Sequence, residues 1–126
     1  MAAYTNGFIT ALEDNEVIIF GSNLAGAHAG GAARQAHKDF GAEWGVFEGM
    51  IGKTYAFPTL DSDYNKLTVD QLESSRDRLY ETANQNPDKT FLLTKVGCGI
   101  AGFEESEMRA LFRYPPSNIT LPEDWL

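Results

Sequence analysis

The chain has 126 residues, of which 43% are hydrophobic and 22% charged, as in a single globular domain over residues 1–126. Its 18 acidic and 10 basic residues give a net charge of −8, which argues against a broad basic surface for duplex nucleic acid. No apolar run approaches the roughly 20 residues that span a membrane, and the single cysteine excludes an internal disulfide. Residues 1–6 show no secretory signal, so we expect a cytoplasmic protein without a membrane partner.

The first half of the chain predicts three strands and one helix. Residues 7–10 suit a short first strand, and residues 17–20 form an apolar run typical of a buried central strand. Small residues between Ala32 and Phe40 predict a helix that packs closely against a sheet. Residues 54–57 predict a further strand, which we expect to end at Pro58.

The second half predicts two helices and two strands. Thr68 and Gln71 have the spacing of a capping box, which predicts a helix that begins there and ends at residues 86–88. Its apolar stripe is expected to consist of Val69, Leu72, Leu79, Tyr80 and Ala83. A strand at 91–96, a short helix at 104–112 and an edge strand at 118–121 follow, with Trp125 folding back onto the core. This alternation of strands and helices predicts an α/β layered fold.

Two glycine-rich loops directly follow apolar runs, at residues 21–31 and 97–103. In a parallel sheet, strands that end in such loops bring them to one edge, where backbone N–H groups can bind an anion. Glycine favours this because it has no β-carbon to block the approach of a phosphate. The pair of loops therefore predicts a site for a small phosphorylated ligand, a class of partner that a net negative charge does not exclude.

Four segments, in order, resemble the macrodomain family of ADP-ribose-binding modules. They are residues 7–10, residues 18–23, the stretch from Glu48 to Pro58, and residues 96–103. The resemblance is to a compact, divergent branch found in bacteria and phages. It implies a three-layer α/β/α sandwich around a mixed, mostly parallel sheet, with the ligand lying across the strand tips.

The same resemblance implies a set of ligand-binding residues. The diphosphate would lie between the Gly30-Gly31 turn and the loop at 97–102, Asn23 would face the distal ribose, and Phe103 would pack against that sugar. The full expected set is Gly21, Ser22, Asn23, Gly26, Gly30, Gly31, Gly97, Cys98, Gly99, Ile100, Ala101, Gly102 and Phe103.

Catalytic residues are less clearly indicated. Phe8 stands where the family has an acidic residue that recognises the adenine amino group. In the family's hydrolase branch an aspartate near the glycine turn activates water, but here Gly30-Gly31-Ala32-Ala33 offers no carboxylate. The candidates that remain are Asn23, His28 and Glu48. We expect no cofactor and no metal, because His28 has no partner at ligand spacing.

Three functions follow as hypotheses. The first is a module that binds ADP-ribose or a related NAD-derived nucleotide at the two glycine-rich loops. The second is an enzyme on the same scaffold, an ADP-ribosyl hydrolase or an ADP-ribose phosphate phosphatase. The third is a protein-interaction module whose loops shape a partner surface and bind no nucleotide.

Overall fold

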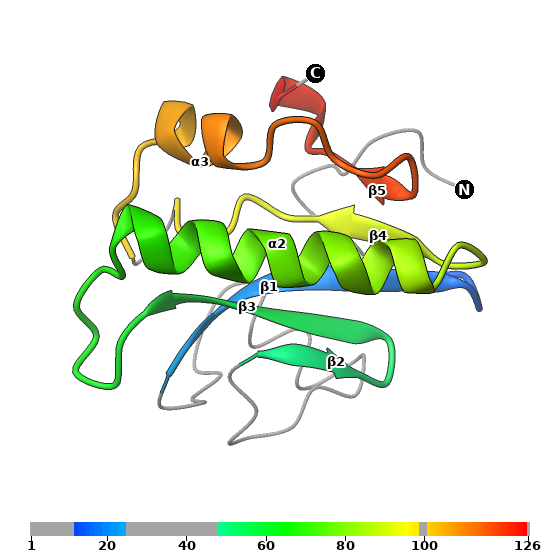
Figure 1. The fold of residues 1–126 in the computed structure, drawn as a ribbon, viewed down its shortest axis with the longest axis horizontal. Helices are drawn as coiled ribbons and strands as arrows, with labels where there is room; N and C mark the ends of the chain where they lie inside the picture. The colour runs from blue at the N-terminus through cyan, green and yellow to red at the C-terminus, as the bar shows by residue number, and fades with distance from the viewer. Residues whose placement is uncertain (1–11, 25–47, 99–100, 126) are drawn as a thin grey trace.

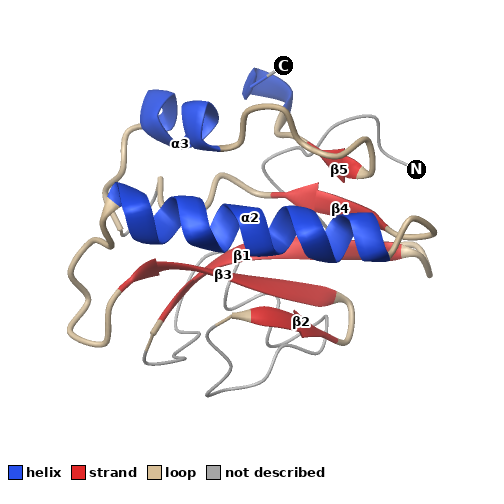
Figure 2. Ribbon diagram, viewed as in Figure 1, coloured by secondary structure: helices blue, strands red, loops and turns tan. Residues whose placement is uncertain are grey.

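A computed structural model describes residues 12–24, 48–98 and 101–125 of the chain. Its strands form one five-stranded mixed sheet in the order β2-β3-β1-β4-β5 (Figures 1 and 2). β1 pairs in parallel with β3 and β4, β4 pairs in parallel with β5, and β2 is antiparallel to β3. The strands are β1 (Glu16–Asn23), β2 (Gly49–Ile51), β3 (Thr54–Leu60), β4 (Thr90–Leu93) and β5 (Ile119–Thr120). The predicted α/β fold with a mixed, mostly parallel sheet is confirmed.

The central strand β1 is buried on both of its faces. Val17 and Ile19 belong to the core cluster on the face that carries the helices, where they join Phe57, Phe91 and other apolar residues. Ile18 points to the opposite face and is buried as well, with 1% of its surface exposed. Burial on both faces is typical of parallel sheets, and it explains why this strand reads as an unbroken apolar run.

Helix α2 (Val69–Gln85) lies along one face of the sheet (Figure 1). It begins as predicted, because the Thr68 hydroxyl accepts a hydrogen bond from Gln71 N and the Gln71 side chain accepts one from Thr68 N. The predicted stripe is correct at Leu72, Leu79 and Ala83 but wrong at Val69, which is 63% exposed. Ser75 takes a buried position in its place, with its hydroxyl accepting a hydrogen bond from Arg78 Nη2.

Aromatic stacking joins the C-terminal elements to the core. Helix α3 (Glu105–Leu111) is followed by Phe112, whose ring lies 5.1 Å from that of Phe57 and 6.3 Å from that of Trp125, centroid to centroid. Trp125 ends a short 3-10 helix, η1 (Glu123–Trp125), and its indole N–H donates to Glu105 Oε1 over 3.2 Å. The expectation that Trp125 folds back onto the core is confirmed.

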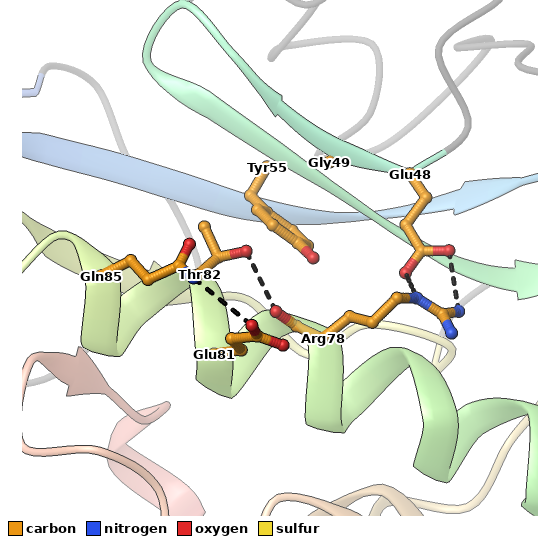
Figure 3. A pocket seen from close by; sticks show the side chains of 7 residues that line it. All are labelled: Glu48, Gly49, Tyr55, Arg78, Glu81, Thr82 and Gln85. Carbon is orange, nitrogen blue, oxygen red and sulfur yellow. Dashed lines mark hydrogen bonds and ion pairs between the residues drawn. The ribbon is translucent and has the colours of Figure 1, made fainter.

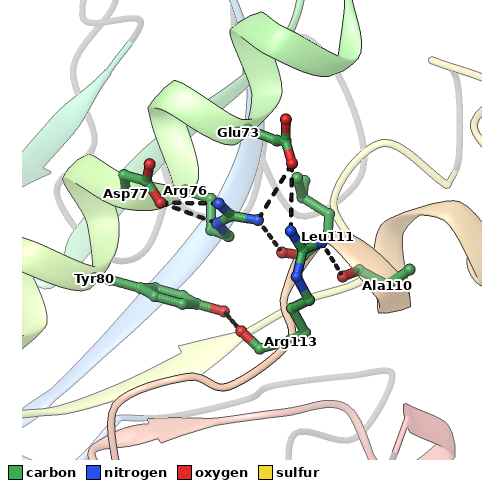
Figure 4. Close-up of polar contacts among 7 residues, drawn as sticks. All are labelled: Glu73, Arg76, Asp77, Tyr80, Ala110, Leu111 and Arg113. Carbon is green, nitrogen blue, oxygen red and sulfur yellow. Dashed lines mark hydrogen bonds and ion pairs between the residues drawn. The ribbon is translucent and has the colours of Figure 1, made fainter.

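Polar contacts from α2 hold the end of α3 (Figure 4). Arg76 Nη1 donates to the carbonyl of Leu111 over 3.1 Å, and the Tyr80 hydroxyl donates to the carbonyl of Arg113 over 2.9 Å. Arg76 is itself paired with Asp77 at 3.0 Å. Carbonyls at a helix C-terminus lack partners within the helix, so Arg76 satisfies one that α3 leaves open, while Tyr80 binds the chain just after the helix.

A single side chain connects the end of α2 to the start of β4. Asn118 Nδ2 donates to three carbonyls, those of Ala83 at 2.8 Å, Asn86 at 3.1 Å and Lys89 at 3.1 Å. The backbone N–H of Phe91 also donates to the carbonyl of Asn118, over 2.8 Å. This Asn118 clamp fixes β5 beside the turn that leads from α2 into the sheet.

Three strand ends differ from the prediction. β1 continues beyond residue 20 to Asn23, β3 passes through Pro58 to Leu60, and β4 ends at Leu93 rather than at residue 96. Pro58 is tolerated because the pairing of β2 with β3 ends at Ala56, so no described strand uses the N–H that proline lacks. The strand expected at 7–10 and the helix expected at 32–40 lie outside the described residues, so the third layer stays a prediction.

The capping box gives the first testable consequence. Thr68→Ala should lower the free energy of unfolding by about 1 kcal/mol, since a backbone N–H at the helix start loses its acceptor. Urea unfolding followed by circular dichroism measures this change. Thr68→Ser keeps the hydroxyl and should stay close to the wild type; equal losses in both variants would show that the cap is not the cause.

Candidate functional site

The carboxyl ends of the parallel strands β3, β1 and β4 meet at one edge of the sheet (Figure 1). Gly21 of β1 lies directly against the turn that follows β4. A β-carbon on Gly21 would stand 3.4 Å from Gly97 N and 3.6 Å from Val96 Cα. The two expected glycine-rich segments therefore come into backbone contact at this edge, at least where the first of them begins.

The turn at residues 97–103 needs glycine at both of its ends. Gly97 and Gly102 each have φ of +78°, a left-handed conformation that side chains disfavour. The N–H of Phe103 donates to the carbonyl of Gly97 over 2.8 Å and closes the loop. A β-carbon on Gly97 would also stand 3.0 Å from Phe103 Cδ2 and 3.2 Å from Met108 Cε. The start of the loop, at Gly97, therefore has no room for a side chain.

Phe103 is more enclosed than the sequence suggested. Its side chain is buried with 8% of its surface exposed, and one face of the ring lies 5.1 Å from the ammonium of Lys66. The ring belongs to the core cluster, and Gly97 and Lys66 are among its neighbours. Its expected contact with a sugar stays a prediction.

Thr59 joins the tips of β3 and β1 and was not anticipated from the sequence. Its hydroxyl donates to the carbonyl of Ser22 over 3.3 Å, and its methyl group would stand 3.4 Å from a β-carbon on Gly97. Ser22 and Asn23 are themselves buried, each with a polar or electrostatic contact of its own. The sequence signal for Thr59 was weak, because Pro58 suggested that the strand had already ended.

Cys98 lies in the turn, but its environment disfavours a thiolate. Burial raises the pKa of the Cys98 thiol, and the negative charge of Glu105 raises it further, while Lys95 acts in the opposite direction. The sulfur also lies 3.6 Å from the carbonyl of Val96. A thiol that stays protonated at neutral pH is a poor nucleophile, so the geometry favours Cys98 as a small residue of the loop wall.

Glu48, a candidate base, is engaged elsewhere (Figure 3). Arg78 of α2 binds its carboxylate with two hydrogen bonds, of 2.6 Å and 3.0 Å, and this contact raises the pKa of the guanidinium. The pair borders a groove of about 430 Å³ lined by Glu48, Gly49, Tyr55, Arg78, Glu81, Thr82 and Gln85. None of these lining residues belongs to the glycine turn, so this groove and the turn are separate features.

The structure therefore brings part of the expected site together. Gly21, Ser22, Asn23, Gly97, Cys98, Gly102 and Phe103 share the edge at the strand tips, and Ala101 packs against the core beside them. Gly26, His28, Gly30, Gly31, Gly99 and Ile100 lie outside the described residues, so their expected roles stay predictions. Within residues 12–24, 48–98 and 101–125, no three His, Cys, Asp or Glu side chains gather as metal ligands would. Of the helices described, none has the length and apolar composition needed to cross a membrane.

Comparison with known proteins rests on three-dimensional similarity. No protein-family model and no curated protein sequence matches the chain. The macrodomain of Mycobacterium tuberculosis DarG superposes with a TM-score of 0.67 and 14% identity, over 94% of this chain and 97% of the other. The chain has the macrodomain fold. The family resemblance seen in its glycine-rich segments is thus confirmed at the level of the fold.

Two further solved structures also superpose on this chain. Thermosipho africanus DarTG in complex with ADP-ribose has a TM-score of 0.58 and 18% identity, over 87% of this chain and 39% of that longer chain. A protein of unknown function from Bacteroides thetaiotaomicron has a TM-score of 0.55 and 15% identity, over 96% and 99% of the two chains. At identities this low, the similarity concerns the architecture and says nothing about the residues of the site.

The glycine turn can be tested by adding one methyl group. Gly97→Ala should destabilise the protein by more than about 2 kcal/mol, because backbone strain and collision with Phe103 and Met108 act together. Gly102→Ala is the matched control: it has the same φ, but only the flexible end of Lys66 lies near its β-carbon, so strain alone should cost about 1 to 2 kcal/mol. Urea unfolding of both variants measures the difference, and equal losses would contradict the tight packing at Gly97.

Tyr55, which lines the groove beside Glu48, predicts that the free energy of unfolding falls at alkaline pH. Burial raises the pKa of Tyr55 from 10.0 to about 12, and the charge of Glu48 contributes. Between pH 10 and 12 the unfolded chain ionises this tyrosine while the folded chain keeps it neutral, so stability that is present below pH 10 is lost as the pH rises. Burial raises the pKa of Tyr80 to about 12 as well, so Tyr55→Phe should remove about 2 to 3 kcal/mol of the wild-type loss and leave the part that Tyr80 contributes.

Tyr114→Phe provides the control for this titration, because Tyr114 is 90% exposed. Its alkaline loss, measured by urea unfolding at pH 9 to 12, should match that of the wild type. A Tyr55→Phe variant with the same pH dependence as the wild type would contradict the raised pKa.

Proposed function

We propose that the chain binds ADP-ribose or a related NAD-derived nucleotide at the strand tips of β3, β1 and β4. The observation that carries this proposal is the backbone contact of Gly21 with the Gly97 turn. It places two glycine segments at one edge of a parallel sheet, which is where open α/β sheets bind ligands. The shared fold of a DarTG structure in complex with ADP-ribose supports the choice of ligand.

The charge of the protein supports recognition through backbone groups. With a net charge of −8, the chain lacks the excess of basic side chains that a large polyanion would require. N–H groups in a glycine turn supply positive potential locally, over the few ångströms that a diphosphate occupies. This favours a small phosphorylated ligand over a nucleic acid.

The described residues favour binding over hydrolysis. The carboxylate of Glu48 is held by Arg78, and burial keeps the Cys98 thiol protonated. Asn23 has no titratable group, so by itself it would orient a ligand or a water molecule and would not accept a proton. His28, the third candidate, lies outside the described residues, and turnover therefore has to be measured directly.

Calorimetry tests the proposal with ADP-ribose, AMP and ribose 5-phosphate. We expect ADP-ribose to bind more tightly than either half, because its diphosphate and both flanking groups reach the edge together. Asn23→Ala should weaken ADP-ribose binding about tenfold through the loss of one buried hydrogen bond. Asn84→Ala, on the exposed side of α2, is the matched control and should bind as the wild type does.

The single cysteine locates the bound ligand. ADP-ribose should slow the alkylation of Cys98 by iodoacetamide, since a ligand on the turn would cover a half-buried thiol. Absence of heat and of protection would contradict the proposal and favour a protein partner. Conversion of ADP-ribose phosphate during long incubation would instead favour the enzyme hypothesis.

A further inference from the structure

A short hairpin carries Lys66 to the same edge of the sheet. Leu60 at the end of β3 forms an antiparallel bridge with Lys66, and Leu67 N donates to the carbonyl of Thr59 over 3.1 Å. Asp61 stabilises the intervening turn, because its Oδ1 accepts hydrogen bonds of 2.9 Å from the N–H groups of both Asp63 and Asn65. The position of Lys66 is thus set by the strand that also carries Thr59.

The Lys66 side chain lies beside the end of the glycine turn, at Gly102 and Phe103. Its ammonium lies 5.1 Å from the centroid of the Phe103 ring. Its Cε and Nζ would stand 3.6 Å and 3.9 Å from a β-carbon on Gly102. A ligand bound beside Gly102 would therefore meet a positive charge.

This charge has no carboxylate partner within the part of the chain that the structure describes. The nearby Lys95, in contrast, lies 2.7 Å from Asp124 and 3.0 Å from Glu105, and Arg78 is bound by Glu48. Lys66 is exposed to water, and at such a site the face of an aromatic ring attracts an ammonium less strongly than a hydrogen-bonded anion does. Lys66 is therefore held at the turn by a weak contact that a stronger, anionic one can replace.

We propose that Lys66 binds a phosphoryl oxygen of the nucleotide at the glycine turn. This inference rests on the proposed function and names a ligand contact that the glycine loops alone do not supply. The protein has a net charge of −8, which repels a diphosphate. Lys66, which has no carboxylate partner among the described residues, offsets this repulsion at the loop. Lys66 is a binding residue in this proposal, and no proton transfer is assigned to it.

The test compares Lys66→Met with Lys89→Met by calorimetry with ADP-ribose. Lys89 also lacks a carboxylate partner among the described residues, but it precedes β4 at the opposite end of the sheet. Lys66→Met should weaken binding about tenfold, as expected for the loss of one charge-assisted hydrogen bond, and Lys89→Met should change it by less than about twofold. Lys66→Arg keeps the charge and should recover most of the affinity.

Measurements with salt and with inorganic pyrophosphate distinguish a failure of this inference from a failure of the proposed function. The wild-type affinity for ADP-ribose should fall between 50 and 300 mM NaCl more steeply than that of Lys66→Met, because screening acts on the charge that the variant lacks. Pyrophosphate should slow the alkylation of Cys98 in the wild type and not in Lys66→Met. Protection by pyrophosphate without ADP-ribose binding would overturn the proposed ligand and support the role of Lys66.

Two results would overturn the inference itself. One is equal ADP-ribose affinity and equal salt dependence in the wild type and Lys66→Met. The other is the absence of any effect of either ADP-ribose or pyrophosphate on the wild type. Thermal unfolding of each variant checks that the fold is retained, which the exposure of Lys66 leads us to expect.

Discussion

At Gly21 and Gly97 two stretches of backbone pass each other with no side chain between them. The separation leaves space for no more than a methyl group on β1, and the φ of Gly97 and its contacts with Phe103 and Met108 exclude even that on the turn. The rest of the edge depends on this contact. Gly97 also accepts the hydrogen bond from Phe103 N–H, and the Phe103 side chain belongs to the core cluster.

The distribution of charge determines which groups attract an anion at this edge. Most of the described cations are committed to carboxylates: Lys53 to Asp14, Arg76 to Asp77, Arg78 to Glu48, Arg113 to Glu73, and Lys95 to Asp124 and Glu105. Such pairs are exposed and contribute little to stability individually, but they remove positive potential from the helix-bearing side of the molecule. An anion that approaches the sheet edge therefore encounters backbone dipoles and Lys66 as the main sources of attraction in the described structure.

Local sequence rules predicted the features that depend on neighbouring residues. Thr68 and Gln71 defined the start of α2, and the apolar run at 17–20 defined the buried centre of the sheet. The glycines that follow β1 and β4 indicated where the strand tips would meet. Each of these features depends on residues that are close together in the sequence, so the local sequence pattern is enough to predict it.

Features that depend on distant partners were missed. Pro58 suggested a strand end because its acceptability depends on how far β2 extends, which no local pattern reports. Val69 fitted the helical stripe, yet it lies in the first turn and is exposed. Glu48 was assigned to the site because of its glycine and aromatic neighbours, whereas an arginine thirty residues later holds its carboxylate. Lys66 had no sequence signal, because only the hairpin after β3 brings it to Phe103.

The Asn118 clamp has a consequence for where such a domain can fold. Residues 118–120 have the sequence Asn-Ile-Thr, an acceptor triplet for N-linked glycosylation. A glycan would be attached to Nδ2, the atom that donates to the carbonyls of Ala83, Asn86 and Lys89, and would leave it one hydrogen for three acceptors. Sugar attachment and the intact junction between α2 and β4 are thus mutually exclusive. The fold is suited to a compartment in which this triplet is left unmodified.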